Sequence, residues 1–146
     1  MARIKLGLQD KIALGNPDAK RDWGYAPDYV ETIYWMMQQE QPDTYVIATG
    51  EKHSIRELVE KASEVVGIEL KWQGNRVEEK GVDKHSSKVL VEVCPEFFRP
   101  AEVELLAGSY SKAKAKFGWQ PKTSFEELVR IMVENDVARE AKRIRV

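Results

Sequence analysis

The feature that most constrains the fold is the alternation of short β-rich runs with longer runs of helical periodicity. In the longer runs, apolar residues recur every three to four positions, as in a helix. Between these runs lie short β-rich runs at 12–14, 45–49, 68–72 and 88–93. Such alternation is typical of α/β architecture rather than of separate helical and strand regions. We therefore expect an α/β fold with a small mixed sheet and several helices. A chain of 146 residues suits one domain, so we expect residues 1–146 to form a single domain.

Two helices are indicated in the first half of the chain. Apolar residues over 27–39 follow a period of 3.6, which predicts a well-buried helix. Ser54 followed by Glu57 forms a capping box, and Gly67 ends the helix that begins there. The polar stretch 74–87, between two predicted strands, is expected to be either a hairpin or a mobile loop.

Two further helices are expected near the end of the chain. A lysine-rich segment over 111–118 ends at a glycine, which predicts a short helix. The last helix begins with one of two capping pairs, Thr123 with Glu126 or Ser124 with Glu127.

Charge and composition exclude several classes of function. The net charge is -1, so the chain lacks the basic surplus of a dedicated nucleic-acid binder. It has no run approaching the roughly 20 apolar residues that cross a bilayer, and we expect a cytoplasmic protein without a membrane partner. Cys94 is the only cysteine, and with only His53 and His85 beside it a metal site has little support. We interpret Cys94 as a small apolar strand residue.

Catalytic and cofactor motifs are absent from the sequence. The nine glycines form neither Gly-x-Gly-x-x-Gly nor a P-loop, so no residue is assigned to a cofactor. No Gly-x-Ser-x-Gly accompanies the two histidines. Tyr110 and Lys114 have the spacing of a Tyr-x-x-x-Lys pair, but their segment is so rich in lysine that a solvated helix face is the better interpretation. We therefore expect no catalytic residue in this chain.

Two arginines are the strongest candidates for binding. Arg21 and Arg99 each lie in a predicted loop beside aromatic residues. A guanidinium is always charged and presents a planar fork of donors that suits a diphosphate or a carboxylate. The alternative is that each arginine pairs with a nearby acid, Asp22, Asp28 or Glu102, and only fixes its loop.

Four segments, in order along the chain, closely resemble the GDP-mannose 4,6-dehydratase family. They are LGNPDAKRDWG at 14–24, DTYVIATGEKHS at 43–54, FFRPAEVELL at 97–106 and FGWQPKTSFEELV at 117–129. The resemblance implies the C-terminal domain of an extended short-chain dehydrogenase, a nucleotide-sugar-binding domain whose Rossmann half is absent. Such enzymes use NADP to convert GDP-mannose to GDP-4-keto-6-deoxymannose.

The resemblance also implies roles for particular residues. Arg21 and Arg99 would grip the diphosphate of GDP-mannose or a related GDP-sugar, Glu102 would bond a sugar hydroxyl of the nucleotide, and the main chain at Leu14 would line the base pocket. The family's catalytic residues and its NADP site belong to the absent Rossmann half, so we expect the isolated chain to be inactive.

Two other functions remain open from the sequence. One is a stand-alone module that binds GDP-sugars. The other is an interaction domain that forms a homo-oligomer through the surface that would otherwise face the Rossmann half.

Overall fold

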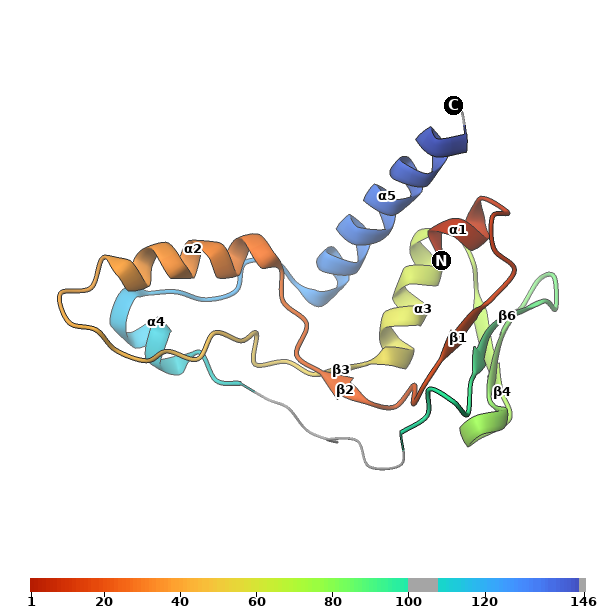
Figure 1. Ribbon diagram of the computed structural model, residues 1–146, viewed down its shortest axis with the longest axis horizontal. Coiled ribbons are helices and arrows are strands. Elements are labelled where there is room, and N and C mark those ends of the chain that lie inside the picture. Colours follow the sequence, from red (N-terminus) through yellow and green to blue (C-terminus); the bar gives the residue numbers. More distant parts are fainter. Residues whose placement is uncertain (100–107, 145–146) are drawn as a thin grey trace. The chain divides into compact units, whose positions relative to one another are not determined.

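The computed structural model describes residues 1–99 and 108–144 (Figure 1). The chain divides into two compact units, each built from segments that are distant in the sequence. The first unit comprises Met1–Ala19, Ser54–Val103 and Val129–Val146, and the second comprises Lys20–His53 and Glu104–Leu128. The single-domain organisation stays a prediction.

A four-stranded mixed sheet forms the centre of the first unit. Its order is β1-β6-β5-β4, with β1 parallel to β6 and the other neighbours antiparallel. The strands are β1 (Ile12–Leu14), β4 (Leu70–Gln73), β5 (Lys80–Asp83) and β6 (Val89–Val93). The expected small mixed sheet is therefore confirmed.

The polar stretch 74–87 contains a strand, so the hairpin alternative is correct. A 3₁₀ turn, η1 (Arg76–Glu78), leads into β5, which pairs with both β4 and β6. Gly81 is buried in β5, and a Cβ at that position would come within 3.0 Å of Val91. The strand is hard to recognise in the sequence because its two ends, Lys80 and Asp83, are charged.

Helix α3 (Ile55–Val65) covers the sheet of the first unit. Val59 of this helix forms a buried cluster with Leu90 and Val91 of β6. Partly buried apolar residues surround the cluster, among them Ile4 of the short helix α1 (Ala2–Lys5), Ile12, Leu70 and Trp72. Burial of these side chains is the main stabilising contribution within the unit.

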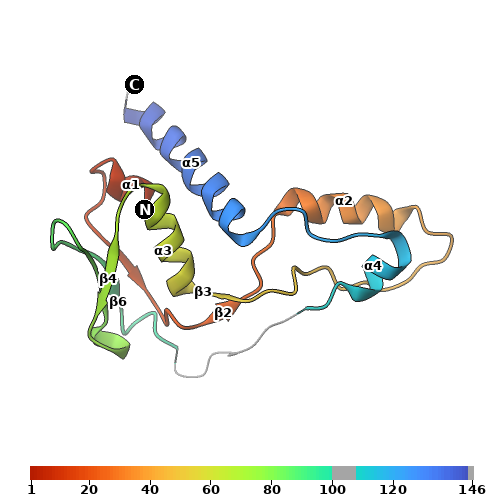
Figure 2. The same cartoon turned by 180° about the vertical axis from the view of Figure 1, so that it is seen from behind.

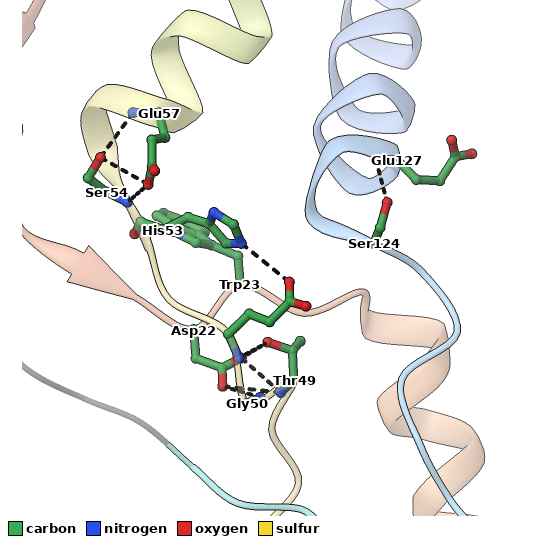
Figure 3. Close-up of polar contacts among 10 residues, drawn as sticks. Asp22, Trp23, Thr49, Gly50, His53, Ser54, Glu57, Ser124 and Glu127 are labelled. Carbon is green, nitrogen blue, oxygen red and sulfur yellow. Dashed lines mark hydrogen bonds and ion pairs between the residues drawn. The ribbon is translucent and has the colours of Figure 1, made fainter.

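Local capping fixes where the helices begin and end. Ser54 Oγ accepts from the Glu57 backbone N–H at 3.1 Å, and Glu57 Oε2 accepts from the Ser54 N–H at 2.6 Å (Figure 3). Gly67 takes a left-handed φ of 74° after this helix, as predicted. Helix α5 (Phe125–Ile144) begins with the second of the two possible pairs, since the Glu127 N–H donates to Ser124 Oγ at 3.2 Å.

The second unit contains α2 (Ala26–Met37), α4 (Ser111–Phe117) and long extended segments. Strand β2 (Lys20–Arg21) pairs with β3 (His53–Ser54). Asp28 is buried in the first turn of α2, where its Oδ2 accepts from the backbone N–H groups of Lys122 and Thr123 at 3.1 and 3.0 Å. One carboxylate therefore ties α2 to the chain that leads into α5.

The predicted strand over 45–49 is wrong. Among the residues that the structure describes, this segment pairs with no strand. Ala48 is buried against the backbone at Gly108, where a Cβ would collide with the Ala48 side chain, and the Tyr45 ring packs edge-on against Phe117 at 5.1 Å. Side-chain packing and the hydrogen bonds that Asp22 accepts from Thr49 hold the segment.

The prediction that 27–39 is a well-buried helix is correct for the helix and wrong for its burial. Within the described part of the chain, the covered face of this helix is the one that carries Asp28 and Thr32. On the opposite face four large apolar side chains are more than half exposed, at Val30 (63%), Ile33 (57%), Tyr34 (59%) and Met37 (78%). Periodicity shows which residues share a face, but it does not show whether anything covers that face.

Candidate functional site

The loop that carries Arg21 is held by its neighbour Asp22. The Asp22 carboxylate accepts from the Thr49 N–H at 2.9 Å, the Thr49 hydroxyl at 2.7 Å and the Gly50 N–H at 3.0 Å (Figure 3). Arg21 lies in β2, is partly buried, and donates from Nη1 to the Lys20 carbonyl at 2.8 Å. The carboxylate of Asp22 therefore accepts hydrogen bonds from a turn 27 residues away.

Trp23 and His53 also hold the loop that carries Arg21. The Trp23 indole N–H donates to the His53 carbonyl at 3.3 Å. The His53 ring stacks on Phe125 with centroids 3.8 Å apart, and its Nε2 lies 3.4 Å from Glu51 Oε2. The polar edge of the Trp23 indole is therefore engaged within the protein.

A small polar cleft of about 220 Å³ adjoins the Arg21 motif within the second unit. Its lining combines one indole with hydroxyl, carboxylate and ammonium groups: Trp23, Thr49, Glu51, Pro121, Lys122, Thr123, Ser124 and Phe125. The cleft therefore offers both donors and acceptors beside the arginine loop.

Leu14 and the segment before Arg99 lie together in the first unit. The Cys94 N–H donates to the Leu14 carbonyl at 2.8 Å, which extends the β1–β6 ladder by one residue. At Gly15 the backbone comes so near to Phe97 that a Cβ would lie 2.5 Å from the Phe97 carbonyl oxygen. This close approach explains why a glycine follows Leu14. Arg99 is exposed two residues after Phe97.

Arg56 fixes the loop between β1 and β2, a role the sequence did not suggest. Its guanidinium donates to both carboxylate oxygens of Glu79 at 2.6 and 2.9 Å, and to Asp18 at 2.8 Å. Its backbone N–H donates to the Pro17 carbonyl at 2.8 Å, and the guanidinium lies 4.5 Å from the Trp72 ring centroid. The Glu79 hydrogen bonds, with those of Asp18, raise the pKa of Arg56 above its ordinary value.

Three of the four predicted substrate-binding residues lie within the described part of the chain, and they belong to different units. Leu14 and Arg99 belong to the first unit, where their segments are adjacent, and Arg21 belongs to the second. Glu102 lies outside the described residues. That Arg21 and Arg99 converge on one ligand therefore stays a prediction.

Asp22 and Asp28, two of the acids considered as partners for the arginines, form hydrogen bonds to the backbone. The carboxylates of Asp22 and Asp28 are each bonded by backbone N–H groups. Each carboxylate therefore connects segments of the second unit.

Tyr110, Lys114 and His85, which the sequence does not assign to a site, lie as follows. The Tyr110 ring packs edge-on against Trp119 at 5.7 Å, while Lys114 is exposed on α4. His85 is exposed, with Nε2 3.9 Å from Glu69. Within residues 1–99 and 108–144, no three His, Cys, Asp or Glu side chains are grouped to hold a metal ion, and no helix is long and apolar enough to span a membrane.

Known structures share this fold. The structure of RMD from Pseudomonas aeruginosa complexed with NADPH matches with a TM-score of 0.73 at 20% identity, over 94% of this chain and 40% of that one. The fold is thus the one found in part of UDP-glucose 4-epimerase and dTDP-glucose 4,6-dehydratase, nucleotide-sugar enzymes of the extended short-chain dehydrogenase class.

Sequence similarity narrows the class to a family. The family described as GDP-mannose 4,6 dehydratase matches residues 1–132, and the chain belongs to it. The GDP-mannose 4,6 dehydratases of Dictyostelium discoideum and Homo sapiens are each 48% identical over 137 residues, which is 94% of this chain. The chain spans 38% and 37% of the length of these two relatives.

Proposed function

We propose that the chain is the substrate-binding part of a GDP-mannose 4,6-dehydratase. The observation that carries the proposal is the 48% identity over 137 residues, a stretch that includes most of this chain. The activity would be the removal of water from GDP-mannose to give GDP-4-keto-6-deoxymannose. The single cysteine agrees with a place in the cytoplasm.

Arg21 and Arg99 would bind the diphosphate of the GDP-sugar. Two guanidiniums can each form paired, charge-assisted hydrogen bonds to phosphate oxygens. The bonds of Asp22 to Thr49 and Gly50 support this role, because they hold the Arg21 loop in place before a ligand binds. The main chain at Leu14 would line the base pocket and Glu102 would bond a hydroxyl of the nucleotide.

The hydride chemistry of such an enzyme would depend on NADP, which takes a hydride from the sugar and returns it. The chain has no Gly-x-Gly-x-x-Gly, so its residues do not form a dinucleotide cradle. We therefore assign NADP to the remaining part of a complete dehydratase, and expect no dehydration of GDP-mannose by this chain with NADP alone.

Calorimetric titration of GDP into the chain tests the proposal. Loss of a charge-assisted hydrogen bond costs about 1.5–3 kcal/mol, so Arg21→Ala and Arg99→Ala should each weaken binding by about tenfold or more. Arg130→Ala, on the exposed part of α5, is the matched control and should leave the affinity unchanged.

Three results would contradict the assignment in different ways. Equal GDP affinity in both variants and the parent chain would remove the arginines from the site, and an absence of GDP binding would remove the site itself. The chain alone is expected to bind GDP weakly, because part of the pocket would lie outside it, so tight binding would favour a stand-alone GDP-sugar-binding module instead.

A further inference from the structure

The loop that follows β1 is tied to the first turn of helix α3. The Arg56 backbone N–H donates to the Pro17 carbonyl at 2.8 Å. The Ile55 N–H donates to the Ala19 carbonyl at 3.1 Å. The start of α3 lies beside the chain that leaves β1 in both views of the molecule (Figures 1 and 2). We call residues 15–19 the 15–19 loop; Pro17 at its centre is fully buried.

The Arg56 side chain adds a charged contact to the same loop. Its Nε and Nη2 donate to Asp18 Oδ1 at 3.1 and 2.8 Å. Its Nη1 and Nη2 donate to the two carboxylate oxygens of Glu79, a buried residue, at 2.6 and 2.9 Å. Its Cζ lies 4.5 Å from the ring centroid of Trp72. Because three partners fix the plane of the guanidinium, it holds Asp18 in one place before any ligand binds.

The other end of the 15–19 loop is held by the segment that follows β6. The Cys94 N–H donates to the Leu14 carbonyl at 2.8 Å. At Gly15 the backbone is so close to the Phe97 carbonyl that no side chain would fit between them. The main chain from Leu14 to the end of the loop is therefore fixed on both sides, and all of these contacts lie within the first unit.

We propose that Arg56 is a positioning residue for the base of a GDP-sugar. This inference rests on the proposed function, in which the main chain at Leu14 lines the base pocket. Arg56 acts on the base only through the 15–19 loop, because it holds the main chain that follows Leu14 in one conformation. Ordering a loop at a binding site opposes association, so a loop that is fixed in advance raises the affinity for GDP. A ligand without a base does not use this main chain and gains nothing from its order.

Titrations of GDP and of pyrophosphate into the full chain, followed by NMR, separate positioning from a purely structural role. In Arg56→Met the affinity for GDP should fall about tenfold or more, because the loop is released. The affinity for pyrophosphate, which has no base, should stay unchanged. Val59→Ala is the matched control, since it removes two methyl groups from the buried cluster of the first unit and lowers stability. Both affinities should be unchanged in Val59→Ala.

Asp18→Ala tests the same contact even if Arg56→Met fails to fold. It removes the bonds from Arg56 to the loop and leaves the pair of Arg56 with Glu79 in place. Because the Asp18 carboxylate is exposed, the affinity for GDP should fall by only about two- to fivefold. Asp10→Ala, at another exposed acid of the first unit, should leave the affinity for GDP unchanged.

Three results would overturn the inference: an unchanged affinity for GDP in Asp18→Ala and Arg56→Met, an equal loss of affinity for GDP and pyrophosphate, or an equal loss in Val59→Ala. The outcome also distinguishes the inference from the proposed function. GDP binding that Arg21→Ala weakens and Arg56→Met does not would reject the positioning role alone. No binding of GDP by the parent chain would reject the proposed function and the inference together.

Discussion

At the scale of single residues, Asp22 shows how an acid beside a candidate binding arginine can bond the backbone of a distant segment. From the sequence, Asp22 is one of three candidates to neutralise Arg21 or Arg99. In the structure its carboxylate accepts three hydrogen bonds from Thr49 and Gly50. Both oxygens take part, since Oδ2 is the acceptor for Gly50 and Oδ1 for the Thr49 hydroxyl.

Asp22→Asn is expected to destabilise the chain by about 1.5–3 kcal/mol, because one charged acceptor is lost and the amide cannot satisfy all three donors. Urea unfolding followed by circular dichroism measures this change. Asp10→Asn, a substitution of the same kind at an exposed position, should alter the free energy of unfolding by no more than about 0.5 kcal/mol. Equal stabilities of the two variants would show that the bonds to residues 49 and 50 contribute little.

At the scale of elements, predictions from the sequence succeeded where the determining interactions are local. The capping box of Ser54 and Glu57 lies within four residues, and the structure has it. The segment 45–49 does not follow its local pattern, because the partners of Ala48 and Tyr45, Gly108 and Phe117, are 60 and 72 residues away (108 − 48 and 117 − 45). Strand β5 was left open between two alternatives, since its charged ends hide a strand that its neighbours stabilise.

The residues of the candidate site likewise differ in how far the local sequence reveals them. Arg21 and Arg99 could be proposed from their chemistry and their place in loops, and Glu102 and Leu14 only because they stand in segments that resemble a family. Arg56 could not, because its partners Asp18 and Glu79 are 38 and 23 residues distant and nothing in the local sequence distinguishes it from a solvated arginine.

Helix α3 holds the loop between β1 and β2 through Arg56, and this can be tested. Arg56→Met should cost about 3 kcal/mol in urea unfolding, since Glu79 is buried and would keep its charge without a partner. Replacing Glu79 with Gln in the same chain should recover part of the loss, because the stranded charge is removed. Arg130→Met, which breaks an exposed pair with Glu134, should change stability by about 0.5 kcal/mol or less. If the two arginine variants are equally stable, α3 does not hold the loop through this side chain.

At the scale of the whole molecule, the two units are stabilised by different kinds of interaction. The first unit has a four-stranded sheet and a buried cluster of Val59, Leu90 and Val91. In the second unit, the segment 45–49 lacks a ladder, and Asp22 and Asp28 connect separate segments by bonds from carboxylate to backbone. Opening a segment held by one carboxylate exposes less apolar surface than opening the sheet.

Native-state hydrogen exchange should therefore separate the two units. Amides of β6 around Val91, which is fully buried, should exchange only through global unfolding, whereas those of 45–49 should exchange through local opening that costs a fraction of the total of about 5–15 kcal/mol. Asp22→Asn should accelerate exchange at Thr49 and Gly50 more than at Val91, because it removes the acceptor of those two amides. The opposite result would be equal protection of the amides of β6 and of 45–49, with an equal loss at all of them in Asp22→Asn. That result would mean that the carboxylate bonds and the sheet unfold as one cooperative structure.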